Sequence, residues 1–213
     1  MTENYEVYCP SCGTAVAFGP PAYCTKCKAI LLPRLIYLVR CFSPIEKIIN
    51  EYKHLGVIKS NDKLSIAEYI ATIRKILSAM NQVVAQIGEV INTKLGASAQ
   101  IAPREDLENT AREIIRLVSS MFEMYKYCSS INPPRKMLSY NFEIYHDALI
   151  EALIKPALEQ TFNIYYLSRD VAANTAKYIK NGAIELKFVY NVNRDKLDES
   201  TRELNRISQK LGV

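Results

Sequence analysis

The stretch from Cys9 to Cys27 reads CPSCGTAVAFGPPAYCTKC and holds four of the six cysteines of the 213-residue chain. They form two Cys-x-x-Cys pairs, one at Cys9 and Cys12 and one at Cys24 and Cys27. Each pair directs two sulfur atoms to one point, and Gly13 follows the first pair, where such a turn favours a positive φ. The sequence therefore predicts one tetrahedral metal site with these four cysteines as its ligands.

The segments around the cysteine pairs are typical of a small β hairpin. YEVY and TAVAF flank the first pair as short strands, and Gly19, Pro20 and Pro21 suit a hairpin tip. A segment of roughly 30 residues cannot bury enough apolar surface to fold alone, so the metal has to stabilise it. From Tyr5 to Ile30 the arrangement resembles the zinc-ribbon and rubredoxin-like knuckle families. The resemblance implies one structural Zn²⁺, with a single iron or metal-free thiols as the alternatives.

The composition of the chain indicates a cytoplasmic protein. Glu3 and Glu6 occupy the place where a secretory signal has basic and apolar residues. The most apolar stretch, AILLPRLIYLVRCF, is interrupted by Pro33 and Arg34, so we expect no membrane span. In the cytosol, paired cysteines bind metal more often than they form disulfides. The net charge of +5 is spread along the chain and does not identify a partner.

Beyond residue 30 the apolar residues recur every three or four positions, which is typical of amphipathic helices. We expect a short helix in PRLIYLVRCF and a second that runs from a capping box at Ser43 to Gly56. A third helix of about 30 residues opens at the Ser65 capping box and ends at Gly96. After a loop, GASAQIA, a further helix begins at Pro103 and ends before Asn132. Its apolar stripe includes Cys128, which we interpret as a core residue.

Two more helices are expected in the second half. One includes Leu138 and Ala152 and is stopped or kinked at Pro156, and the next extends to the Asn-Gly pair at 181–182. Arg169 falls on the apolar stripe of this last helix. A charge at such a position calls for a partner such as a glutamate or a ligand, or for a place at the edge of the buried face.

The C-terminal residues change character again. Residues 184–192 alternate apolar and polar side chains, as in a half-buried strand. Because a single strand needs a partner, we expect it to pair with the short strands near Val7 or Val16. A charged helix follows in residues 195–211, where leucines recur every seventh residue and suit docking on a neighbouring helix or a partner.

These patterns predict a mainly α fold, a helical bundle of long antiparallel helices with a small N-terminal β zinc ribbon. The chain divides into three expected parts. Residues 1–30 form the ribbon, residues 31–182 form the helical bundle, and residues 183–213 form a strand followed by the charged helix.

The two histidines each follow a glutamate by three residues, in Glu51-Tyr-Lys-His54 and Glu143-Ile-Tyr-His146. Ferritin-like di-iron bundles use this motif twice, and a knuckle joined to such a bundle resembles a rubrerythrin with its modules reversed. On a helical projection, however, His54 lies opposite its apolar stripe and Glu143 lies off its own. The long helices place no glutamate on their buried seams. We therefore interpret both pairs as surface residues and expect no buried acid or imidazole.

No nucleotide-binding glycine loop, nucleophile elbow or His-Glu-x-x-His motif is present, which favours a binding protein. We expect a non-enzymatic interaction protein that binds nucleic acid, or a protein of a nucleic-acid-handling complex. The candidate contacts are Lys26, Lys28, Arg34 and Arg40. Archaeal and eukaryotic transcription factor B is similar in having an N-terminal ribbon ahead of helices, although its helices are shorter.

Two alternatives remain open. One is a structural protein that forms a homo-oligomer or docks a partner through its helices, and the other is the di-iron protein. The richness in isoleucine and tyrosine, with short polar loops, is typical of a thermophilic and archaeal source.

Overall fold

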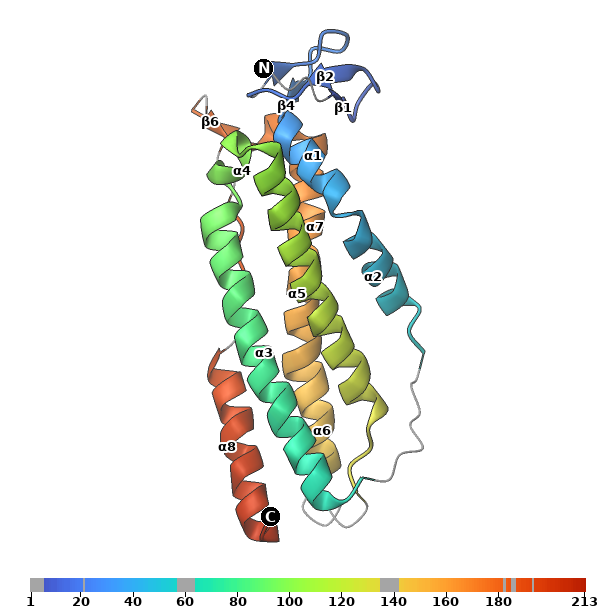
Figure 1. Ribbon diagram of the computed structural model, residues 1–213, viewed down its shortest axis with the longest axis vertical. Helices are drawn as coiled ribbons and strands as arrows, with labels where there is room; N and C mark the ends of the chain where they lie inside the picture. Colours follow the sequence, from blue (N-terminus) through green and yellow to red (C-terminus); the bar gives the residue numbers. More distant parts are fainter. Residues whose placement is uncertain are drawn as a thin grey trace. The chain divides into compact units, whose positions relative to one another are not determined.

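The structure is a computed structural model, and it describes residues 6–20, 22–56, 64–134, 142–181, 183–184, 187–192 and 194–213. Within these ranges the chain is mainly helical with a few short strands, so the predicted fold class is confirmed (Figure 1). None of the helices in these ranges is long and apolar enough to cross a lipid bilayer.

The chain forms two compact units, and the boundary between them falls within three long helices. Unit 1 contains residues 1–47, 87–116 and 161–190, and unit 2 contains residues 48–86, 117–160 and 191–213. The division into ribbon, bundle and tail that the sequence suggested remains a prediction.

The N-terminal strands of unit 1 form two antiparallel hairpins. Strand β1 (Glu6–Tyr8) pairs with β2 (Ala15–Ala17), and β3 (Ala22–Tyr23) pairs with β4 (Ile30–Leu31), so the strands expected in YEVY and TAVAF are confirmed. The hairpin tip expected at residues 19–21 was wrong, because β2 and β3 belong to different two-stranded sheets. Val7 is completely buried. The second hairpin was not predicted because strands of two residues are too short to show an alternating pattern.

Two predicted helices follow the ribbon, α1 (Pro33–Cys41) and α2 (Ser43–Lys53). The prediction of a loop in the segment GASAQIA was wrong, because this segment contains a short helix, α4 (Ala97–Ile101). Ala99 in this helix is completely buried, so packing within unit 1 orders a segment whose polarity suggested a loop. Gly96, which precedes α4, has a φ of 75°, a value that glycine adopts without strain.

The longest helix is α3 (Ile66–Lys94), which has 29 residues as expected. Its start confirms the predicted capping box. The backbone N–H of Ser65 donates to Oε2 of Glu68 at 2.8 Å, and the N–H of Glu68 donates to Oγ of Ser65 at 3.3 Å. Two backbone donors at the helix start are satisfied in this way.

Replacing Ser65 with alanine is expected to lower the free energy of unfolding by about 1 kcal/mol, because one donor at the helix start loses its acceptor. Urea denaturation would measure the change. Ser78→Ala is the matched control, since Ser78 lies on the exposed face of the same helix and alanine should be neutral or slightly stabilising there. Equal stabilities of the two variants would show that the box contributes nothing.

The next long helix, α5 (Arg104–Ser130), matches its prediction, and Cys128 is completely buried. Of the stop or kink expected at Pro156, the stop was wrong, because the helix continues past the proline. Helix α6 (Phe142–Leu149) continues through a π-helical turn, η2 (Ile150–Ile154), into α7 (Lys155–Ala173). The N–H of Lys155 donates to the carbonyl of Ile150, five residues back. This wider turn lies just before Pro156 and admits a residue that has no N–H of its own.

Helix α7 ends at Ala173 and not at residue 181 as predicted. The side chains of Thr175 and Asn174 donate to Val171 and Asp170, local bonds that compete with further helix. A 3₁₀ turn, η3 (Thr175–Tyr178), follows. On the same helix, Arg169 is exposed and its Nη1 lies 3.5 Å from Oε1 of Glu46, the kind of partner that the sequence analysis expected.

The prediction of one strand over residues 184–192 was also wrong. Strand β5 (Ile179–Lys180) pairs with β6 (Ala183–Ile184), and residues 187–192 have no regular structure. The φ of Asn181 is 51°, as in the two-residue Asn-Gly turns that close β hairpins. In the described part of the chain, β1 and β2 pair only with each other, and η3 contacts β4.

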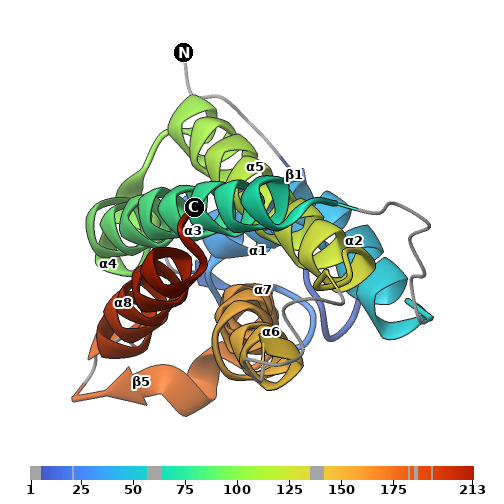
Figure 2. The ribbon, with the colours of Figure 1, turned by 90° about the horizontal axis from the view of Figure 1, so that it is seen from below.

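The C-terminal helix α8 (Arg194–Leu211) was predicted, and within unit 2 it lies beside α3 (Figures 1 and 2). Leu197 and Leu204 are buried. Nη2 of Arg74 donates to Oγ of Ser208 at 2.9 Å, and the hydroxyl of Tyr145 donates to a backbone carbonyl of α8 at 2.6 Å. The predicted docking face of this helix is therefore used inside its own unit.

Candidate metal centre and ribbon surface

The four predicted ligands come together in the ribbon. The sulfur atoms of Cys9, Cys12, Cys24 and Cys27 all lie within 4.8 Å of one another. Two of the separations are 3.6 Å, between Cys9 and Cys27, and 3.4 Å, between Cys12 and Cys24. A tetrahedral ion with Zn–S bonds of about 2.3 Å needs sulfur atoms about 3.8 Å apart, so the four thiols fit such an ion. Tetrahedral sulfur ligation suits zinc and also iron.

The two knuckles have the same backbone design. In the first, the N–H of Gly13 donates to the carbonyl of Cys9 at 2.8 Å, and in the second the N–H of Lys28 donates to the carbonyl of Cys24 at 2.9 Å. The φ of Gly13 is 69° and that of Lys28 is 61°. A lysine in this left-handed region costs on the order of 1 kcal/mol more than a glycine. The second knuckle therefore holds a strained lysine where the first has a glycine.

Hydrogen bonds and crowding set the charge of the sulfur atoms. The hydroxyl and the backbone of Thr14 lower the pKa of Cys12 to about 6, and the backbone N–H of Cys27 lowers the pKa of Cys24. For Cys27, the N–H of Ala29 lowers the pKa, but burial and the neighbouring sulfur atoms outweigh it and raise the pKa to about 12. Four thiolates at these distances repel one another, and a divalent cation among them offsets that repulsion.

Arg34 attaches the ribbon to the helices of unit 1. Its Nε donates to the carbonyl of Ala102 at 3.0 Å and its Nη1 to the carbonyl of Gln100 at 3.4 Å. The guanidinium also lies 5.1 Å from the ring centre of Phe18, which in turn makes an edge contact with Tyr37. The Arg34 side chain, which was predicted to contact nucleic acid, is therefore held by contacts within unit 1.

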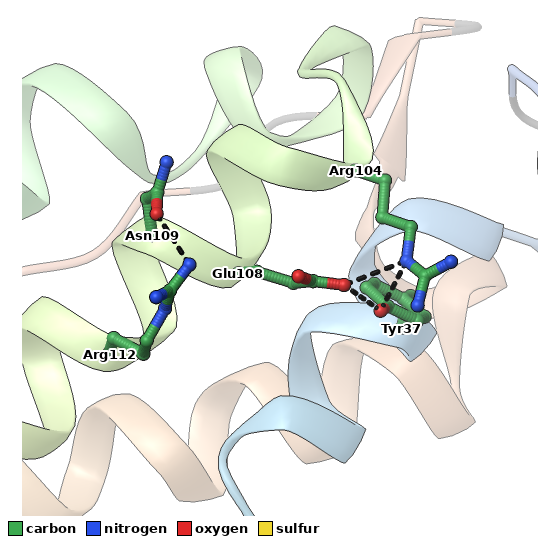
Figure 3. Close-up of polar contacts among 5 residues, drawn as sticks. All are labelled: Tyr37, Arg104, Glu108, Asn109 and Arg112. Atoms are coloured by element: carbon green, nitrogen blue, oxygen red, sulfur yellow. Dashed lines mark hydrogen bonds and ion pairs between the residues drawn. The ribbon is translucent and has the colours of Figure 1, made fainter.

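A second polar cluster holds α1 on α5 (Figure 3). The hydroxyl of Tyr37 donates to Oε1 of Glu108 at 2.5 Å, and Nε of Arg104 lies 2.7 Å from both oxygens. The Tyr37 hydroxyl and then the Arg104 guanidinium lower the pKa of the Glu108 carboxyl. On the next turn of α5, Arg112 donates to Asn109. The cluster was not predicted, because it depends on two helices that are far apart in the sequence.

The other predicted basic contacts are exposed, namely Lys26, Lys28 and Arg40. The sequence analysis missed two exposed aromatic residues of the ribbon, Tyr8 and Tyr23, whose exposed fractions are 55% and 67%. A signal for them exists in the sequence, since each tyrosine comes directly before the first cysteine of a pair.

The prediction for His146 was wrong, whereas His54 is exposed as expected. His146 is only 5% exposed, and its Nδ1 is hydrogen-bonded to the hydroxyl of Tyr69. The buried face of this helix runs through His146, Leu149 and Leu153, whereas Ala152, which the sequence suggested as a buried position, is exposed.

The di-iron alternative gains no support from the described residues. Among them, the four cysteines form the one group of His, Cys, Asp or Glu side chains that could hold a metal ion. The side chain of Glu143 lies outside the described residues. No family model, no curated protein and no solved structure matches the chain.

Proposed function

We propose that this protein is a non-enzymatic interaction protein whose metal-stabilised ribbon binds nucleic acid, alone or as part of a nucleic-acid-handling complex. One observation carries the proposal. Lys26 and Lys28 stand exposed on either side of Cys27, on a knuckle held by the four-cysteine cluster. Exposed ammonium groups of this kind are the usual protein contacts of phosphate oxygens, which supports the proposal.

The proposed metal is one Zn²⁺ per chain, with a single iron as the alternative. Four sulfur ligands complete a tetrahedral site and leave no open position for a substrate, so the metal has a structural role. A knuckle fixed by a metal presents its lysines with little loss of conformational entropy on binding. Arg34 is left out of the proposed contact surface, because backbone carbonyls accept from its guanidinium.

The C-terminal helix offers less to a partner than its heptad of leucines suggested. Leu197 and Leu204 are buried within unit 2. Assembly through this face therefore requires α8 to leave its own unit, and the ribbon is the better candidate for an interaction surface.

Fluorescence anisotropy with labelled single- and double-stranded DNA and RNA, measured at several salt concentrations, tests the proposal. The Lys26→Glu/Lys28→Glu variant should bind at least about tenfold more weakly, and its slope of log K against log salt should fall by about 2. Lys75→Glu/Lys210→Glu makes the same charge change at exposed positions of unit 2 and serves as the control. Absence of binding, or equal losses in the two variants, would contradict the proposal.

A further inference from the structure

The ribbon carries an unusual concentration of exposed aromatic side chains. In the described part of the chain the two most exposed tyrosines are Tyr23 and Tyr8. Their neighbours Val7, Cys9 and Cys24 are at most 2% exposed. The strands therefore bury the adjacent residues and leave both phenol rings exposed to solvent, where they are free to stack on a ligand.

The cysteine cluster joins the short segments that carry these rings and the lysines. Tyr8 adjoins Cys9, whose sulfur lies 3.6 Å from that of Cys27. Cys27 is flanked by Lys26 and Lys28, and Tyr23 leads directly into the same knuckle. Aromatic rings and ammonium groups thus belong to one small metal-held module.

The backbone at Lys28 is a second and independent sign of function. Its φ of 61° matches that of Gly13 in the first knuckle, where the chain has the residue that avoids strain. Strained positions cluster at functional sites. An exposed lysine held in this conformation beside a metal site is a candidate contact for an anion.

The ammonium groups and the aromatic rings of the ribbon recognise different parts of a nucleic acid. Ammonium groups attract phosphates of any nucleic acid, whereas an exposed ring stacks on a base whose face is free. Base faces are free in a single strand and are covered by neighbouring bases in a duplex. The described part of the ribbon also has no element that could enter a groove of a duplex. Its strands have two or three residues each, and the first helix, α1, begins after the ribbon.

We infer that the ligand of the ribbon is single-stranded nucleic acid, whose bases stack on Tyr8 and Tyr23 and whose phosphates contact Lys26 and Lys28. The inference rests on the proposed nucleic-acid binding and specifies its substrate class. Because stacking accepts every base, binding is expected to depend weakly on sequence.

Three 12-nucleotide probes test the inference, namely labelled oligodeoxythymidylate, oligouridylate and a 12-base-pair DNA duplex. The full chain should bind at least one single strand at least about tenfold more tightly than the duplex. Tyr8→Ala and Tyr23→Ala should each weaken single-strand binding by roughly 5- to 100-fold, whereas Tyr8→Phe and Tyr23→Phe keep the ring and should bind like the wild type. Tyr127→Ala removes an exposed tyrosine outside the ribbon and should change nothing.

Lys28→Gly separates strain from ligand contact. It should raise the resistance of the ribbon to metal removal, because glycine relieves the strain, and at the same time weaken single-strand binding. Unchanged binding in this variant would exclude Lys28 as a contact. Metal content of one ion per chain confirms that each variant has a folded ribbon.

The outcomes distinguish the inference from the proposed function. Equal or tighter duplex binding that is lost in the Lys→Glu variant but unchanged in both Tyr→Ala variants would overturn the inference and leave the proposed function standing. No binding to any probe would overturn both.

Discussion

Removing the metal, or replacing Cys24 with serine, is expected to unfold the ribbon and leave unit 2 folded. Cys24 is completely buried and its sulfur lies 3.4 Å from that of Cys12, so its loss opens the centre of the site. Structural zinc contributes about 10–16 kcal/mol to small domains of this kind, far more than short hairpins gain from their own packing. The ribbon should therefore unfold completely when the metal is lost.

Hydrogen exchange with mass spectrometry would locate the effect. Peptides from residues 6–31 should exchange rapidly after chelation, whereas peptides from α8 should stay protected, and elemental analysis should show the loss of one ion per chain. Cys41→Ser is the matched control, because Cys41 lies outside the cluster, and it should keep the metal. A ribbon that stays protected without metal would refute a structural role for the ion.

The second large effect is expected at His146. Its Nδ1 is hydrogen-bonded to the Tyr69 hydroxyl, and its imidazole is also hydrogen-bonded to the backbone of Cys128. His146→Ala creates a cavity and removes the hydrogen bonds that the imidazole makes with the buried Tyr69 hydroxyl and the Cys128 backbone. Its free energy of unfolding should therefore fall by about 3 kcal/mol or more. Denaturation by urea, followed by circular dichroism, measures this loss.

Acid should destabilise unit 2 through the same side chain. Burial lowers the pKa of His146 below its ordinary value of 6.5 and outweighs the opposite effects of Asp147 and the Cys128 backbone. The folded state thus favours the neutral ring, and its contribution is present above the unfolded pKa. The free energy of unfolding should therefore decrease as the pH falls below about 6.5, at up to about 1.4 kcal/mol per pH unit.

A pair of histidine variants identifies the source of this pH dependence. His146→Gln removes the titrating ring, so its stability between pH 6.5 and pH 5 should decline less steeply than that of the wild type. In His54→Asn, which alters the exposed histidine, the steep decline should remain because His146 is unchanged. An equal decline in all three proteins would mean that other groups cause the loss.

Much of the fold followed from local patterns. The cysteine spacing predicted the four-sulfur cluster, and the capping box at Ser65 predicted the start of α3. Asn181 was a correct turn signal with a wrong interpretation, since it follows the hairpin strand β5 and does not end a helix. The helix does not stop at Pro156, because the π-helical turn just before it admits a proline that an α-helix of regular pitch would not.

The candidate site likewise combines residues that could be identified from the sequence with residues whose role depends on the fold. Lys26 and Lys28 could be named from the sequence because they flank a metal ligand, but Arg34 could not be told from them. The charge of a basic residue is evident from the sequence, but its hydrogen-bond acceptors are evident only from the fold. The acceptors of Arg34 lie more than sixty residues away from it along the chain. The exposure of Tyr8 and Tyr23 likewise depends on which neighbours the hairpins bury.

The sequence by itself determined the elements whose cause is local, namely the metal knuckles, the helix starts and the amphipathic helices, because spacing and capping act over a few residues. Only the tertiary structure decided that His146 is buried against Tyr69, that Arg34 is bound to α4 and the residue after it, and that Leu204 is covered within unit 2. These outcomes depend on contacts between distant segments, and the physical reason is that burial is a property of the packed chain and not of any one stretch of it.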